Sequence, residues 1–184
     1  MNYILKPALT LFITAVITIS ALSVAYNLTL EPIARQQQRT HEAAMREVLP
    51  TASVFRQLTL EKSGSISAVY EALIGAGIIG YVVELSPVGY GGNIDMVVGI
   101  SVPDEKVTGM RILRHSETPG LGALATREVF YRRFDDRALV PLTVVRGYSG
   151  ENEISAITSS TITTRAITNA VNEAIEWFNR RGGQ

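Results

Sequence analysis

The sequence predicts an α+β protein in which one N-terminal transmembrane helix precedes a small, mainly antiparallel sheet domain with packed helices. Three observations support this fold class. A charge-free apolar run lies near the N-terminus, β-branched segments occupy the middle of the chain, and an amphipathic helical pattern ends it. The 184 residues suffice for one domain of usual size and an anchor.

The anchor is predicted by the stretch from Pro7 to Leu30, which contains no charged residue. At about 1.5 Å per residue this helix reaches roughly 36 Å, enough to cross a hydrocarbon core of about 30 Å. A cleaved signal peptide is the competing interpretation, because Ser23-Val24-Ala25 resembles a cleavage site. The run is long for a signal, so we favour a helix that spans the lipid bilayer.

We expect three parts: an anchor over residues 1–30, a helical stalk over 31–50 and a domain over 51–184. The stalk is predicted to end at Pro50. Lys6 precedes the charge-free run, whereas three arginines follow it within the stalk. Counting basic residues alone slightly favours a large domain on the inner side of the membrane.

The sheet is predicted by apolar and β-branched segments separated by Gly and Pro turns. Strands are expected at Ile79–Leu85, Ile94–Val102, Lys106–Arg114 and Leu142–Arg146. The span Val54–Tyr70 is ambiguous, Leu124–Phe134 is expected to form a helix, and Tyr148–Asn152 a loop.

The last helix is predicted by an apolar stripe at 3.6-residue spacing. The stripe consists of Ile162, Ala166, Ile167, Ala170, Val171, Ala174, Ile175 and Phe178. Six hydroxyl residues lie at the start of this helix: Thr158, Ser159, Ser160, Thr161, Thr163 and Thr164. A helix N-terminus with free N–H groups suits a phosphate, although ordinary helix capping by Ser and Thr is the alternative.

Composition excludes several functions. Lys+Arg and Asp+Glu are both 17, so there is no basic excess to attract nucleic acid. Cysteine is absent, which excludes disulfides, cysteine-ligated clusters and thiolate catalysis. The two histidines, His41 and His115, are too few for a His-rich metal site.

Four motifs together resemble a known family. Gly89-Tyr90-Gly91-Gly92, His115 to Gly122 (HSETPGLG) and Ile162 to Ala166 (ITTRA) follow one another in the family's order, and Met45 to Pro50 (MREVLP) also matches. The chain resembles RnfG, the membrane-anchored flavin subunit of Rnf electron-transport complexes, and is more distantly similar to NqrC. The resemblance covers nearly the whole chain.

The resemblance implies an FMN-binding domain in which the flavin phosphate forms an ester with a threonine hydroxyl, installed by a flavin transferase. The family pattern is Asp-x-x-Ser/Thr-Gly-Ala-Thr, and Thr161 stands at its acceptor position. Ser155, Ser159 and Ser160 replace the Asp, Gly and Ala of that pattern. Arg165, one turn further on, could add a charged donor to the phosphate.

The resemblance also implies the remaining cofactor-binding residues. We expect the loop from Glu117 to Gly122 to approach the flavin ring, with Gly120 and Gly122 permitting close contact and Leu121 covering one ring face. The expected set around covalent FMN at Thr161 is Ser159, Ser160, Ile162, Thr163, Thr164, Glu117, Thr118, Gly120, Leu121 and Gly122. Neither a catalytic residue nor a metal ligand is expected.

The implied function is that of an electron-carrying subunit in a redox-driven ion pump of the ferredoxin:NAD oxidoreductase type, inactive alone. Its implied partners are the other membrane and redox subunits. The resemblance places the large domain on the periplasmic or extracellular side of the cell membrane, against the basic-residue count. The alternatives are a structural subunit without flavin, a membrane-tethered binding domain and, least favoured, a flavin reductase.

Overall fold

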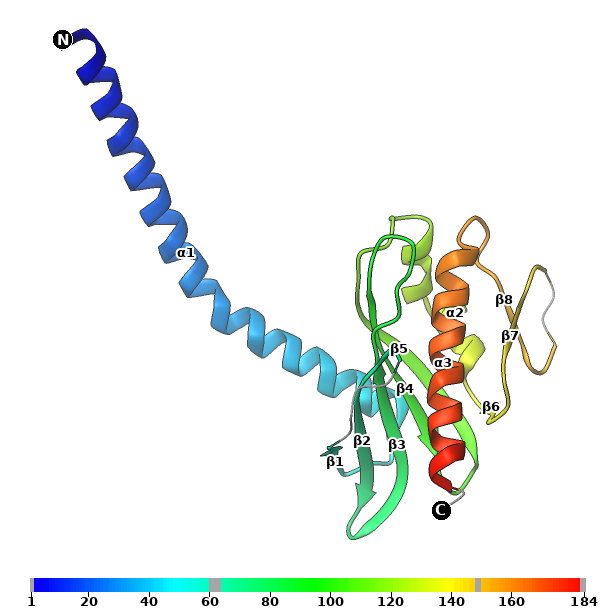
Figure 1. Ribbon diagram of the computed structural model, residues 1–184. Helices are drawn as coiled ribbons and strands as arrows, with labels where there is room; N and C mark the ends of the chain where they lie inside the picture. The colour runs from blue at the N-terminus through cyan, green and yellow to red at the C-terminus, as the bar shows by residue number, and fades with distance from the viewer. Residues whose placement is uncertain (1, 60–63, 148–149, 183–184) are drawn as a thin grey trace. The chain divides into compact units, whose positions relative to one another are not determined.

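The computed structural model describes residues 2–59, 64–147 and 150–182 (Figure 1). The chain forms two compact units, one that ends at His41 and one that begins at Glu42. The long helix α1 (Asn2–Val48) contributes to both. The predicted α+β class is confirmed, because an apolar N-terminal helix precedes an antiparallel sheet with packed helices.

Helix α1 is long and apolar enough to cross a membrane from Leu5 onward, with a mean hydropathy of 2.2 in its apolar window. Its threonine hydroxyls donate to carbonyls of the preceding turn. Thr10 donates to Lys6 O at 2.9 Å, and Thr18 donates to Thr14 O at 2.8 Å. These polar side chains are therefore satisfied within the helix, as apolar surroundings require.

Six strands form one antiparallel sheet in chain order. They are β1 (Val54–Leu58), β2 (Ile66–Ile74), β3 (Gly77–Leu85), β4 (Ile94–Ser101), β5 (Lys106–His115) and β6 (Arg137–Ala138). The three central strands predicted from the sequence are confirmed as β3, β4 and β5. The ambiguous span after Val54 contains β1 and the first part of β2, which pair with each other.

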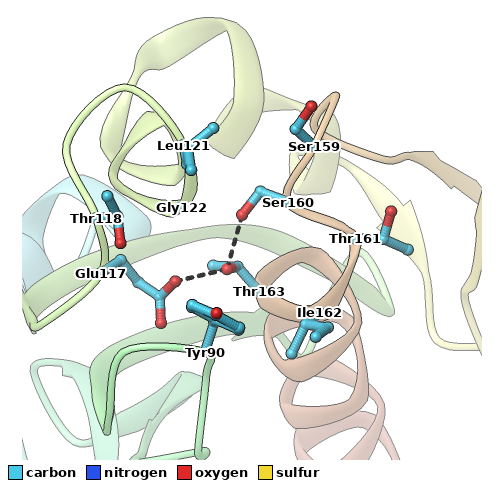
Figure 2. A pocket seen from close by; sticks show the side chains of 10 residues that line it. All are labelled: Tyr90, Glu117, Thr118, Leu121, Gly122, Ser159, Ser160, Thr161, Ile162 and Thr163. Carbon is cyan, nitrogen blue, oxygen red and sulfur yellow. Dashed lines mark hydrogen bonds between the residues drawn. The ribbon is translucent and has the colours of Figure 1, made fainter.

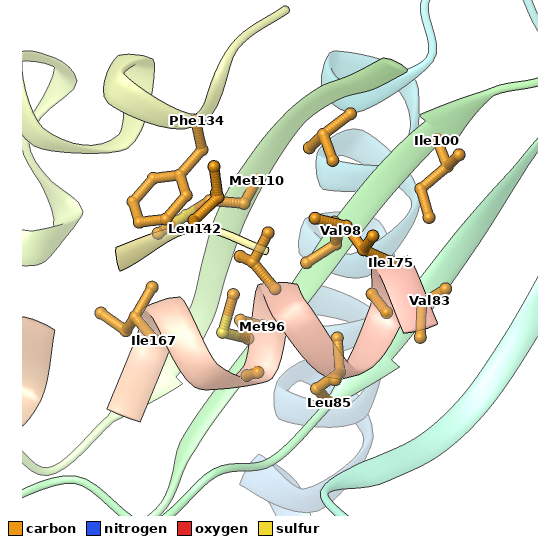
Figure 3. Close-up of a cluster of buried hydrophobic side chains, with 14 of the residues drawn as sticks. Val83, Leu85, Met96, Val98, Ile100, Met110, Phe134, Leu142, Ile167 and Ile175 are labelled. Atoms are coloured by element: carbon orange, nitrogen blue, oxygen red, sulfur yellow. The ribbon is translucent and has the colours of Figure 1, made fainter. Parts of the chain in front are cut away.

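The two faces of the sheet pack against different helices, because neighbouring strand residues point to opposite sides. Val83 and Val98 lie in the main core beneath α3 (Thr161–Gly182) (Figure 3). Val82 and Val97, one residue away in each strand, pack instead with the end of α1. The main core also contains the buried stripe of α3: Ile167, Ala170, Val171, Ala174 and Ile175.

The end of α1 is part of the sheet unit. Thr108 donates its hydroxyl to Val48 O at 2.5 Å, where a helix end leaves carbonyls without partners. Gly99 provides the room, since a Cβ there would lie 2.9 Å from Val48 O. Arg111 on β5 pairs with Glu47 at 2.6 Å. Packing and polar contacts thus fix this last part of the helix to the sheet.

The single helix predicted from Leu124 to Phe134 is wrong. The segment forms three short pieces, η1 (Gly122–Thr126), α2 (Glu128–Tyr131) and η2 (Arg132–Phe134). Arg127 interrupts the helix with an extended backbone, φ −78° and ψ 145°. After the break, Phe130 and Phe134 are buried and pack their rings edge to face at 5.6 Å.

A small parallel pair, β7 (Thr143–Val145) and β8 (Glu153–Ser155), leads the chain to α3. Strand β7 confirms the centre of the strand predicted over 142–146. The first two residues of the loop predicted over 148–152 lie outside the described residues. Ile154 of β8 is buried in the main core, so this pair holds the turn before α3 against the sheet unit.

Candidate functional site

Three segments that are distant in sequence meet at one end of α3. They are the loop 87–93 after β3, the loop 116–122 after β5, and the turn 157–160 with the start of α3. Between them lies a cavity of about 430 Å³ (Figure 2), within the range of about 300–1,000 Å³ typical of small-molecule sites. It is lined by Tyr90, Glu117, Thr118, Leu121, Gly122, Ser159, Ser160, Thr161, Ile162 and Thr163.

Glu117 joins these three segments through its carboxylate. The side chain is only 6 % exposed. Its Oε1 accepts the Gly91 N–H at 2.9 Å, and its Oε2 accepts the Thr163 hydroxyl at 2.6 Å. His115 Nδ1 accepts the backbone N–H of Glu117 at 3.1 Å, which holds the start of the loop. Both carboxylate oxygens therefore bind protein donors.

Two glycines make room for this carboxylate. A Cβ on Gly89 would collide with Glu117 Oε1 and lie 2.7 Å from Ile94 Cδ1. A Cβ on Gly122 would collide with Glu117 Oε2 and lie 2.8 Å from Thr163 Oγ1. Both distances are far below ordinary contact of about 3.5–4.0 Å. Gly89 and Gly122, one from each loop, are thus required because a side chain at either position would collide with the buried carboxylate of Glu117.

The hydroxyl cluster divides into fully buried and partly exposed side chains. Thr163 and Thr164 have no exposed surface. Thr164 Oγ1 accepts the Ile157 N–H at 3.1 Å and donates to Ser160 O at 3.0 Å. Thr161 is half-buried and lines the cavity, and in the described part of the chain its hydroxyl forms no hydrogen bond. Thr161 is thus the threonine at the start of α3 whose hydroxyl is available to a ligand in the cavity.

The turn before α3 has the backbone that the family pattern assigns to glycine. Ser159 has φ +63°, in the left-handed region that L-residues occupy at a cost. The next residue, Ser160, is 7 % exposed and donates its hydroxyl to Thr163 Oγ1 at 2.8 Å. The replacements at Ser159 and Ser160 are therefore accommodated, the first in a left-handed backbone and the second through a buried hydrogen bond.

The cavity combines a polar and an apolar side. The polar side is the N-terminus of α3, which begins at Thr161; the first N–H groups of a helix lack intrahelical acceptors and attract anions. The apolar side is formed by exposed Tyr90 (71 %), Leu121 (42 %) and Ile162 (58 %). A ligand that has a phosphate at one end and a flat apolar ring at the other fits these residues.

Most of the expected site residues lie together. All of them line the cavity except Gly120 and Thr164. Gly120 has φ +78° and nothing near its missing Cβ, so it serves the turn. Arg165 is exposed and is not among the lining residues. The expected set omitted Tyr90, although its place within the Gly89–Gly92 motif was a usable signal.

Comparison with known proteins identifies the class and then the family. A family model described as an FMN-binding domain matches residues 89–176, so the cavity belongs to an FMN-binding domain. A second model, of the RnfG N-terminal region, matches residues 1–48. The chain belongs to the RnfG family, whose members are the G subunits of ion-translocating oxidoreductase complexes.

Two relatives illustrate the family. The G subunit of the proton-translocating ferredoxin:NAD(+) oxidoreductase complex of Clostridium ljungdahlii is 36 % identical, covering 91 % of this chain and 85 % of its own. The G subunit of the Na(+)-translocating ferredoxin:NAD(+) oxidoreductase complex of Acetobacterium woodii is 34 % identical, covering 95 % and 91 %.

Two solved structures have the same fold. NqrC of Shewanella oneidensis superposes with a TM-score of 0.52 at 19 % identity, over 68 % of this chain and 66 % of that one. The corresponding component of the Na(+)-translocating NADH-quinone reductase of Parabacteroides distasonis superposes with a TM-score of 0.57 at 16 % identity, over 76 % and 90 %.

Proposed function

We propose that this chain carries electrons on an FMN bound covalently through a phosphoester to Thr161, as one subunit of a redox-driven ion pump. The observation that supports this most directly is the position of Thr161. It is the first residue of α3, lines the cavity and keeps its hydroxyl free of protein partners within the described residues. FMN, when bound, would supply the redox chemistry, while the protein binds and orients it.

The neighbouring threonines are poor acceptors. Thr163 donates to Glu117 from a fully buried position, and Thr164 holds two hydrogen bonds inside the protein. Attachment at either would require these bonds to break and the first turn of α3 to open. A phosphoester on Thr161 instead keeps the helix intact, and its negative charge would be stabilised by the N–H groups at the helix start.

The serines at positions 159 and 160 do not argue against attachment. Ser159 already has the left-handed backbone that glycine would adopt, and Ser160 satisfies its hydroxyl internally. With both serines in place, Thr161 still lines the cavity. The rival function, a structural subunit without flavin, therefore receives no support from this turn.

The residues on the other side of the cavity suit the flavin ring. Leu121 and Ile162 offer apolar contact, Tyr90 offers an aromatic face, and Thr118 offers a hydroxyl. Glu117, which the sequence also suggests for contact with the ring, has both carboxylate oxygens occupied by protein donors. We assign the ring to the tyrosine and the two aliphatic side chains, and we reserve Glu117 for a different role.

The proposed setting follows from the family. Residues 1–30 would anchor the chain in the cell membrane, 31–50 would form a stalk, and 51–184 the FMN-binding domain on the periplasmic or extracellular side. Its partners would be the other membrane and redox subunits, the lipid bilayer and, during maturation, a flavin transferase. Co-purification with several polytopic membrane proteins is expected, and a chain that purifies alone from native membranes would contradict this assembly.

Orientation can be tested with a single introduced thiol. The chain contains no cysteine, and Glu176 is exposed on α3. In cells whose cytoplasmic membrane is intact and whose outer membrane, where there is one, has been permeabilised, Glu176→Cys should react with a membrane-impermeant maleimide. Reaction only after the cytoplasmic membrane is opened would place the domain inside, as the count of basic residues suggests.

The attachment site can be tested by flavin fluorescence of the denatured protein in a gel. In a host that supplies the transferase, wild type and Thr161→Ala are compared with Thr158→Ala as the matched control. Thr158 is an exposed hydroxyl of the same turn outside the cavity lining. Loss of fluorescence in Thr161→Ala alone supports the proposal, whereas fluorescence retained in Thr161→Ala excludes this site.

A further inference from the structure

The buried carboxylate of Glu117 has a role that differs from direct contact with a ligand. It accepts one hydrogen bond from the loop after β3, through Gly91 N–H, and one from α3, through Thr163. These partners are 26 and 46 residues away in the chain. One side chain thus fixes the spacing of the segments that enclose the cavity, and Figure 2 shows its contact with Thr163.

The carboxylate also fixes the direction of a chain of hydroxyl hydrogen bonds. An ionised carboxylate can only accept, so Thr163 must donate to it. Thr163 has one hydroxyl proton, and therefore Ser160 must donate to Thr163. Both hydroxyl protons point along the chain toward Glu117. An amide in place of the acid would turn its N–H₂ donor toward either Gly91 N–H or Thr163, so that one of the two contacts must break or reverse.

Glu117 is not paired with a cationic side chain in the part of the chain that the structure describes. No ion pair involves this residue within 2–59, 64–147 and 150–182, and the donors that it binds are an amide and a hydroxyl. Glu117 nevertheless lines the cavity. A negative charge held beside a cavity in partly water-excluded surroundings acts on a bound group more strongly than it would in water.

We propose that Glu117 is a positioning residue that sets both the geometry of this cavity and the reduction potential of the flavin bound in it. The geometric part concerns the protein alone. The second part rests on the proposed function: a fixed negative charge beside the ring opposes the gain of electrons and so lowers the reduction potential of the flavin.

The test compares full-length wild type with Glu117→Gln and Glu117→Asp. Gln keeps the size but removes the charge, whereas Asp keeps the charge but withdraws it from Gly91. The matched control is Glu173→Gln. Glu173 is a half-buried acid of α3 that accepts two hydrogen bonds from Ser65, at 2.8 and 2.7 Å, and does not line the cavity.

Two readouts separate the two parts of the proposal. The midpoint potential of bound flavin is measured by spectroelectrochemical titration, and exchange of the Gly91 amide hydrogen by mass spectrometry. We expect a higher potential in Glu117→Gln alone, with Glu117→Asp and Glu173→Gln close to wild type. Exchange at Gly91 should be faster in Glu117→Asp, whose shorter side chain loses this contact, and unchanged in Glu173→Gln.

Each outcome decides one part. An unchanged potential in flavin-loaded Glu117→Gln overturns the role in tuning, and unchanged exchange at Gly91 in Glu117→Asp overturns the role in positioning. If wild type from its native host carries no flavin, the proposed function and the tuning fail together, while the exchange measurement still decides the positioning. If Glu117→Gln does not fold, Glu117→Asp decides the tuning, because it keeps the charge. A flavin midpoint potential in Glu117→Asp that differs clearly from that of wild type and Glu173→Gln would contradict tuning by charge.

Discussion

The packing around Glu117 makes Gly122→Ala the most demanding test of the site geometry. The added methyl carbon would collide with Glu117 Oε2 and lie 2.8 Å from Thr163 Oγ1. To reach ordinary contact at about 3.5–4.0 Å, Thr163 Oγ1 must move away from the methyl carbon by roughly 1 Å and Glu117 Oε2 must move further. That movement breaks the hydrogen bond between Thr163 and Glu117, which is 2.6 Å long.

The expected cost has two contributions. Overpacking a close-packed position costs about 1–3 kcal/mol, and losing a hydrogen bond to a charged group costs about 1.5–3 kcal/mol. Together they lower the free energy of unfolding by about 2.5–6 kcal/mol. For a chain of this size, the corresponding fall in Tm is at least about 5 °C.

Gly120→Ala is the matched control from the same loop. No atom lies within 4 Å of the position of its Cβ, but its φ is +78°. The cost is therefore that of a left-handed backbone alone, about 1–2 kcal/mol. Thermal unfolding in detergent can be followed by fluorescence of Trp177, the single tryptophan, whose ring contacts Tyr81 at 5.4 Å. A Gly122→Ala variant no less stable than Gly120→Ala would refute this account of the cavity.

Two further predictions concern the backbone and the charges of the domain. Ser159→Gly should stabilise the protein by about 0.5–1 kcal/mol in denaturant unfolding. Relief of the left-handed backbone gains about 1–2 kcal/mol, which exceeds the entropy cost of glycine, about 0.4–1 kcal/mol. A loss of stability would show that the serine side chain has a role of its own. Asp135 has an Oδ1 that is buried without a partner among the described residues, and burial raises the pKa of Asp135 above 3.8, with Arg111 and Arg132 opposing the shift. The folded state therefore holds the Asp135 proton more tightly than the unfolded state does. The free energy of unfolding, relative to that of Asp135→Asn, should be greatest below pH 3.8 and should fall as the pH rises through the folded pKa. Denaturant titrations in which this difference stays constant, or rises with pH, would contradict the prediction.

Strong periodic patterns made most of the fold predictable. The charge-free run before Glu31 and the alternation through Val107, Met110 and Ile112 each belong to one regular element. Strand β1 gave no such pattern, because it lies at the sheet edge and Val54 is 60 % exposed. The pieces from Gly122 to Phe134 share a helical periodicity, and no breaker residue in the sequence marks the extended backbone of Arg127 that divides them.

The sequence predicted which residues gather at the site, but not the burial or the contacts of each one. Ile162 fits the apolar stripe of α3, yet it is 58 % exposed and lines the cavity, because the stripe begins one turn before the helix reaches the core. The partners of Glu117 lie 26 and 46 residues away, and no local pattern encodes contacts at that separation. The same holds for the difference between fully buried Thr163 and Thr164 and partly exposed Thr161.

The most direct test of the central claim is peptide mass spectrometry of the wild-type protein purified from its native membrane. We expect the peptide that contains Thr161 to carry the added mass of FMN less one water, with fragment ions that assign the modification to Thr161 rather than to Thr163 or Thr164. An unmodified peptide from an active native complex would contradict the account, and the chain would then be a scaffold or would hold its flavin without a covalent bond.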